Sequence, residues 1–124
     1  MTDTLTIALA QLNPTVGDID GNIGLIREAR AAAAAAGADL VVTSELVVSG
    51  YPPEDLVIRP IVQQTIEREI SALASETSDG GPALLVGAPW VDGGKLYNAA
   101  LLLDGGEIVA TRFKHDLPNY GVFD

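Results

Sequence analysis

The feature that most constrains the fold of this chain is an alternation between short, almost continuously apolar runs and longer segments with helical periodicity. The apolar runs cover residues 5–11, 39–43 and 83–88, and Gly, Pro or Asn residues separate them from the helical segments. Strands covered on both faces in a parallel sheet have this composition. A strand, a helix and a second strand joined by short connections form a βαβ unit with a right-handed crossover. The sequence therefore predicts an α/β fold that begins βαβαβ.

Both segments between the runs carry signals for amphipathic helices. Their apolar residues recur at helical spacing, at Ile23, Ile26, Ala29, Ala33 and Ala36 in the first and at Val62, Ile66, Ile70 and Leu73 in the second. Asp18 or Asp20 is expected to cap the first helix, and Gly37 to end it. Pro60 fits the first turn of the second helix, where its missing N–H is not needed.

The last third of the chain has a different pattern. Asp-Gly-Gly occurs at 92–94 and again at 104–106, and such triplets mark tight turns between β-like runs. Residues 96–103 and 108–113 are therefore expected to be antiparallel strands. The whole is predicted to be a mixed sheet with its helices on one face, while residues 45–60 form an ordered loop with a short helical turn.

Composition and charge exclude several classes of function. The chain has 124 residues, suited to one domain, and a net charge of −10, so electrostatic binding of nucleic acid is not expected. The N-terminus lacks the positive region of a signal peptide, and no apolar run approaches the roughly 20 residues that span a bilayer. We therefore expect a cytoplasmic protein without a membrane partner. The absence of cysteine excludes disulfides, thiolate metal sites and a cysteine nucleophile within these residues.

Two charged residues stand where chemistry could occur. Glu45 follows the apolar run 39–43, and the carboxyl ends of buried parallel strands are where α/β folds place ligands. It is either a proton-transfer group, or a cap or solvent-exposed carboxylate. Lys114 closes the apolar run 108–113 and is either a cation aimed at a developing oxyanion or an ordinary surface lysine.

The remaining polar and aromatic candidates are weaker. His115, the single histidine, could form a Ser–His–Asp triad with Ser44 or Ser49, but no Gly-x-Ser-x-Gly motif is present. No spacing of carboxylates around the histidine favours a metal site. Tyr51 and Tyr120 lie in Pro/Gly-containing loops and either line a pocket or pack their loops. Asn98, inside an apolar run, is expected to satisfy a backbone group.

Several motifs, taken in order along essentially the whole chain, resemble the nitrilase, or carbon–nitrogen hydrolase, superfamily. They are residues 7–18 (IALAQLNPTVGD), 38–42 (ADLVV) and 44–46 (SEL). Two longer and more specific motifs, residues 49–56 (SGYPPEDL) and 114–124 (KHDLPNYGVFD), are similar to the glutaminase domains of glutamine-dependent NAD⁺ synthetases.

The resemblance implies a fold and a set of site residues. The fold would be an α–β–β–α sandwich, of which residues 1–124 supply the N-terminal portion. Glu45 matches the general base, Lys114 the group that stabilises the oxyanion, and Tyr51 and Tyr120 the tyrosines of the glutamine pocket. The family's cysteine nucleophile lies beyond the lysine motif, so we expect this chain alone to be inactive.

The resemblance also implies partners and cofactors. Glutamine would be the substrate, and ammonia would pass to a C-terminal synthetase domain of the same polypeptide. That domain would use ATP, Mg²⁺ and deamido-NAD⁺ to make NAD⁺, while this chain itself would need no cofactor. A homo-oligomer is expected.

Three alternatives to a synthetase glutaminase stay open. The first is a stand-alone nitrilase-like amidase, and the second a non-catalytic interaction module with the nitrilase fold. The third is a flavodoxin-like binding domain, which needs a phosphate-binding loop after the first strand; residues 13–17 (NPTVG) are a poor candidate for one.

Overall fold

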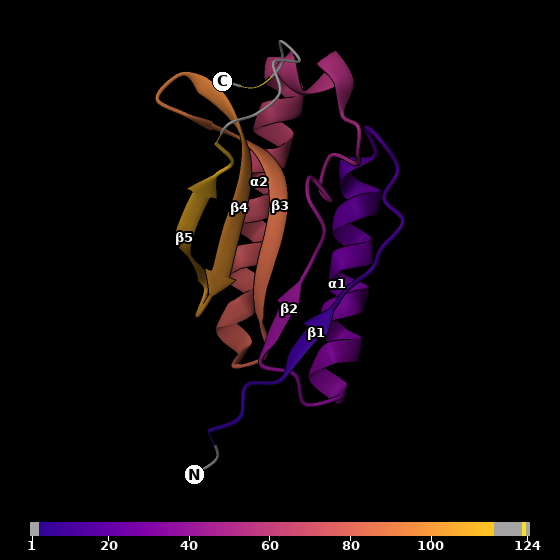
Figure 1. The fold of residues 1–124 in the computed structure, drawn as a ribbon, viewed down its shortest axis with the longest axis vertical. Coiled ribbons are helices and arrows are strands. Elements are labelled where there is room, and N and C mark those ends of the chain that lie inside the picture. The colour runs from indigo at the N-terminus through magenta and orange to yellow at the C-terminus, as the bar shows by residue number, and fades with distance from the viewer. Residues whose placement is uncertain (1–2, 116–122, 124) are drawn as a thin grey trace.

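The computed structural model describes residues 3–115 and residue 123. In this part of the chain, five strands form one sheet in the order β1-β2-β3-β4-β5, and two long helices lie on one face of it (Figure 1). The strands are β1 (Ile7–Leu9), β2 (Leu40–Val42), β3 (Ala83–Asp92), β4 (Lys95–Asp104) and β5 (Glu107–Phe113). The helices are α1 (Ile19–Ala35) and α2 (Pro60–Glu76), with short 3₁₀ turns η1 (Glu54–Ile58) and η2 (Thr77–Asp79).

The topology confirms the predicted order of elements. β1, β2 and β3 pair in parallel, with α1 and α2 as the two crossovers, which is the βαβαβ unit. β3, β4 and β5 then pair antiparallel through the two predicted turns. Both turns use glycines with positive φ, at 93–94 and 105–106, a backbone conformation that glycine adopts without steric cost. The result is a mixed sheet with an antiparallel half and a parallel half.

Helix α1 begins where the sequence places a capping aspartate. Asp18, rather than Asp20, is the N-cap, and its carboxylate accepts the Gly21 N–H at 3.1 Å. Of the predicted apolar face, Ile23, Ile26 and Ala33 are buried. Ala36 is exposed, contrary to prediction, because the helix has already ended at Ala35 and Ala36 is its C-cap.

Helix α2 starts at Pro60 as predicted and completes the core. Its residues Ile66, Ile70 and Leu73 are fully buried. They belong to the same core cluster as the inward residues of the sheet, Val41, Leu84, Val86, Leu101 and Leu103. The apolar stripe of the helix therefore packs on the alternate residues of the central strands, as the two periodicities require.

Strand lengths differ from the sequence prediction. β1 has three residues, not the seven of the run 5–11, while β3 extends to Asp92, four residues beyond the run 83–88. β1 lies at the edge of the sheet and pairs only with the short β2, whereas β3 pairs with β4 over nine successive positions. The available pairing partner, rather than the length of the apolar run, sets where each strand ends.

The face of the sheet away from the helices remains partly apolar. Ile7 and Leu9 on β1 are 47% and 72% exposed. Leu85 and Leu102 on the same face are half-buried. Within residues 3–115, neither helix is both long and apolar enough to cross a lipid bilayer.

Candidate active site

The loop that follows β2 is carried directly across β3. Thr43 extends the parallel pairing, since its N–H donates to the Leu85 carbonyl at 3.0 Å and its hydroxyl donates to the same oxygen at 2.9 Å. The chain returns to β3 at Val48, whose N–H donates to the Gly87 carbonyl at 3.2 Å. Between these two anchors, residues 44–47 form a short loop, the Glu45 loop, which carries the Glu45 side chain.

Gly87 makes this crossing possible. A Cβ atom at this position would lie 2.5 Å from the carbonyl oxygen of Ser44 and 2.6 Å from the amide nitrogen of Leu46. Any other residue at 87 would therefore push the backbone around Glu45 away from the sheet. Leu46, which follows Glu45, has a φ of +53° and is fully buried, so the Glu45 loop has a backbone conformation that few non-glycine residues adopt.

Asn22 on helix α1 fixes the end of the Glu45 loop at Val48. Its side-chain amide donates to the carbonyls of Thr15 at 2.8 Å and Val48 at 3.0 Å, and its side-chain oxygen accepts the Thr15 N–H at 2.8 Å. Asn22 is only 1% exposed. Because a buried amide with these partners has a defined orientation, the start of α1 and the loop that bears Glu45 are connected as one unit.

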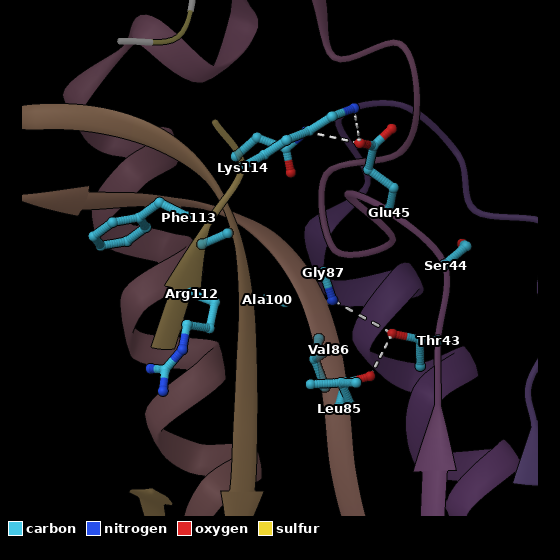
Figure 2. Close-up of a pocket in the computed structure, with 12 residues that line it drawn as sticks. Thr43, Ser44, Glu45, Leu85, Val86, Gly87, Ala100, Arg112, Phe113 and Lys114 are labelled. Carbon is cyan, nitrogen blue, oxygen red and sulfur yellow. Dashed lines mark hydrogen bonds and ion pairs between the residues drawn. The ribbon is translucent and has the colours of Figure 1, made fainter. Parts of the chain in front are cut away.

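Glu45 meets the second predicted charged residue at this point. The Lys114 ammonium lies 2.7 Å from Oε1 of Glu45, although 69 residues separate them in sequence (Figure 2). Lys114 follows β5 directly, and its N–H donates to the Asn98 carbonyl at 2.9 Å, which continues the antiparallel pairing by one residue. The two side chains are 41% and 49% exposed. The structure thus brings together the residues that the sequence singled out as base and cation.

Asn98 is the site residue whose role the sequence analysis missed. We expected its side chain to satisfy a backbone group, but its amide donates instead to Oε1 of Glu45 at 3.1 Å. The residue is 7% exposed and lies on β4 opposite Pro89, on the same face as Gly87. Its position within an apolar strand was the available signal, but the partner comes from a distant loop that no local pattern reveals.

A cavity of about 300 Å³ opens beside the ion pair. Its walls include apolar parts of β3, β4 and β5, among them Leu85, Ala100 and Phe113, and Glu45 and Lys114 lie on its polar side (Figure 2). Asn98 also lines the cavity. A carboxylate there can accept a proton, and an ammonium beside it can stabilise a negative charge that develops on a bound group. The arrangement therefore has a proton acceptor and a stabilising cation, the two polar functions that acyl transfer requires in addition to a nucleophile.

Two other predicted residues, Tyr51 and Ser49, are not among the described residues that line the cavity. Tyr51 is 61% exposed. Tyr120 lies outside the described residues. Ser49 is buried, with its hydroxyl directed at the carbonyls of Leu46 and Gly50, which does not suit a nucleophile. In the described part of the chain, no group of three or more His, Cys, Asp or Glu residues is placed to hold a metal ion.

Comparisons with known proteins agree on the kind of domain. The family model "Carbon-nitrogen hydrolase" matches residues 6–123. A glutamine-dependent NAD⁺ synthetase from Rhodobacter capsulatus is 44% identical over 124 residues, which cover all of this chain and 22% of that protein. The solved glutamine-dependent NAD⁺ synthetase from Acinetobacter baumannii superposes with a TM-score of 0.82 at 38% identity, over 95% of this chain and 22% of that one.

A second kind of solved structure also matches. An amidase from Nesterenkonia sp. has a TM-score of 0.78 and 30% identity, over 92% of this chain and 44% of the amidase. The chain spans about a fifth of the length of the curated synthetases it matches. Its mixed sheet with two helices on one face is part of a nitrilase-type sandwich. On the family match and on these identities, the chain belongs to the carbon–nitrogen hydrolase family.

Proposed function

We propose that residues 1–124 form the N-terminal portion of a glutaminase domain, which hydrolyses the side-chain amide of glutamine to glutamate and ammonia within a glutamine-dependent NAD⁺ synthetase. The observation that carries the proposal is the Glu45–Lys114 pair at the edge of a cavity. The pair occurs in a chain that is 44% identical along its whole length to such a synthetase.

In the proposed reaction, Glu45 is the general base and a cysteine outside these 124 residues is the nucleophile. Glu45 takes the thiol proton, and the thiolate attacks the amide carbon to form a tetrahedral oxyanion, which Lys114 stabilises. The C–N bond then breaks, and the protonated Glu45 returns its proton to the departing nitrogen, which leaves as ammonia. Water, deprotonated by Glu45, attacks the thioester, and the released thiolate recovers the proton as glutamate leaves.

The other expectations from the family resemblance remain part of this proposal. Tyr51 and Tyr120 would contact the substrate glutamine. ATP, Mg²⁺ and deamido-NAD⁺ would bind to a C-terminal synthetase domain, which would receive the ammonia. The protein would be cytoplasmic and assemble as a homo-oligomer, and the chain of 124 residues would have no glutaminase activity alone.

The experiment that tests this proposal uses the full-length protein encoded by the reading frame that contains this chain. In the Glu45→Gln variant, NAD⁺ formation supported by glutamine should fall by about 10²–10⁴-fold, because the general base is lost. NAD⁺ formation supported by added ammonia should stay within about twofold of wild type, because that reaction bypasses the glutaminase site. Wild-type rates with both nitrogen sources would show that Glu45 has no such role.

A stand-alone amidase is the second candidate, and the likeness to the Nesterenkonia amidase favours it. In that case the full-length wild-type protein would hydrolyse simple aliphatic amides faster than glutamine and would form no NAD⁺ with either nitrogen source. Hydrolysis of neither amide class would favour the non-catalytic interaction module.

A further inference from the structure

Asn98 contacts both members of the ion pair, through different atoms. Its side-chain amide donates to Oε1 of Glu45 at 3.1 Å, and its main-chain carbonyl accepts the N–H of Lys114 at 2.9 Å. One residue on β4 thus fixes the carboxylate of the first charged residue and the backbone of the second. Among the hydrogen bonds between described residues, the Lys114–Glu45 bond joins the two charged groups to each other, and the bonds of Thr43, Val48 and Asn22 hold the loop around Glu45.

The two donors on Glu45 converge on the same oxygen. The Lys114 ammonium lies 2.7 Å from Oε1, the oxygen that also accepts from Asn98. Among the described residues, Oε2 accepts no hydrogen bond. Two donors on one oxygen restrict the rotation of the carboxylate more than a single flexible lysine would. Oε2 is then the oxygen available to take and return a proton.

Asn98 itself is held rigidly. It lies within β4, paired with Pro89 on β3, and is 7% exposed. A side chain on a central strand has far less freedom than one on a loop, and Glu45 lies on a loop. The amide can therefore act as a fixed reference against which the Glu45 carboxylate is oriented.

We propose that Asn98 is a positioning residue for the reaction, which orients the Glu45 carboxylate so that Oε2 faces the reacting atoms. This inference rests on the proposed function, because it requires Glu45 to be the base. A displacement of the base by about 1 Å is enough to slow a reaction by about 100-fold. The amide donor, and not merely the volume of Asn98, is the property that matters.

The test compares two substitutions of Asn98 in the full-length protein. Asn98→Leu keeps the branching at Cγ, with a larger volume, and removes the donor, while Asn98→Asp keeps both the shape and the volume and replaces the donor with a second carboxylate. Both should lower kcat for glutamate release from glutamine by about 10–100-fold, with KM for glutamine changed less than about threefold. NAD⁺ formation supported by ammonia, measured on the same samples, should be retained and shows that the synthetase reaction is intact.

The control is Thr77→Val, which also removes a buried polar group, here in η2. Thr77 is 1% exposed and bonds to the Ala74 carbonyl and the Gly106 N–H, away from the residues that line the cavity. This variant should lower the thermal midpoint but leave kcat near wild type. Wild-type kcat in Asn98→Leu, or a kcat loss in Thr77→Val as large as in Asn98→Leu, would overturn the positioning role. Loss of activity in Glu45→Gln but not in Asn98→Leu refutes this inference alone, and full activity in Glu45→Gln refutes the proposed function.

Discussion

An ion pair lies at each end of the sheet: Arg30–Asp79 at one end and Glu45–Lys114 at the other. The two pairs differ in their hydrogen bonds. At the end where the helices finish, Arg30 on α1 makes a two-fold contact with Asp79 at 2.7 and 2.9 Å, and its Nε donates to the Pro82 carbonyl at 2.9 Å. At the other end, Lys114 touches Glu45 through one oxygen only, beside a cavity. The first pair has both carboxylate oxygens occupied, and the second leaves one oxygen available.

The difference separates a structural contact from one suited to chemistry. The Arg30 side chain is 11% exposed and connects α1 to the segment between α2 and β3, so the pair joins elements that must stay together. Hydrogen bonds from Arg30, with a further one from the Gly81 N–H, hold the pKa of the Asp79 carboxyl well below its usual range. A carboxylate bound in this way is a poor proton acceptor. In Glu45, by contrast, both hydrogen bonds from described residues go to Oε1, and Oε2 accepts none from them.

Among the variants that probe this difference, the removal of the cation of the site pair should have the greatest effect. Lys114→Met keeps the length of the side chain, and in the full-length protein it should lower kcat/KM for glutamine hydrolysis by about 10²–10³-fold, the usual range for loss of an oxyanion donor. The free energy of unfolding should change by about 1 kcal/mol or less, because an ion pair this exposed contributes little. Chemical denaturation and glutamate release would measure the two quantities, and a large loss of stability would make Lys114 a structural residue instead.

A smaller effect, on stability as well as activity, is expected where the Glu45 loop crosses the sheet. Gly87→Ala places a methyl group against the backbone of Ser44 and Leu46, and should lower the free energy of unfolding by about 1–3 kcal/mol and also reduce glutamine hydrolysis. Gly24→Ala is the matched control, because nothing lies within 4 Å of the added methyl and alanine favours the helix interior by about 0.5–1 kcal/mol. If both variants gave the same change in denaturation, the close crossing at Gly87 would be wrong.

The smallest effect should come from the structural pair, and it should depend on pH. Because the folded state lowers the pKa of Asp79, this carboxylate adds stability above the usual aspartate pKa of about 4, and the contribution is lost as the pH falls below that value. Asp79→Asn should therefore lower the thermal midpoint slightly near pH 7, with a difference from wild type that shrinks below pH 4. Midpoints recorded from pH 7 to pH 3 test this, and a difference that grew on acidification would have the wrong sign.

Much of the fold that positions these residues could be predicted from the sequence. The capping aspartate, the proline at the start of α2 and the Gly-Gly turns are local signals, and the elements they delimit were predicted correctly. Glu45 and Lys114 were predicted as candidates because each follows an apolar run, and in the structure the two runs end at the same edge of the sheet. What brings them to 2.7 Å is the pairing of β3 with β4 and of β4 with β5, which was predicted in kind but not in register.

The supporting residues could not be found in this way. In the sequence, Gly87 is only a small residue in an apolar strand. Its role depends on the backbone of residues 44–46, which passes so close that a Cβ atom would not fit. Asn98 reads as a misplaced polar residue until Glu45 is seen beside it. The extent of β1 depends on the length of its neighbour rather than on its own sequence. The roles of Gly87 and Asn98 and the extent of β1 all depend on contacts between residues far apart in the chain, which no local sequence pattern reveals.

If the Glu45–Lys114 pair serves chemistry and the Arg30–Asp79 pair serves stability, Lys114→Met and Asp79→Asn should differ when the rate of glutamate release and the thermal midpoint are measured in one full-length protein. Lys114→Met should lose at least about 100-fold in rate with its midpoint nearly unchanged, while Asp79→Asn should keep its rate and lose only stability at neutral pH. Equal losses of rate in the two variants would contradict this assignment of roles.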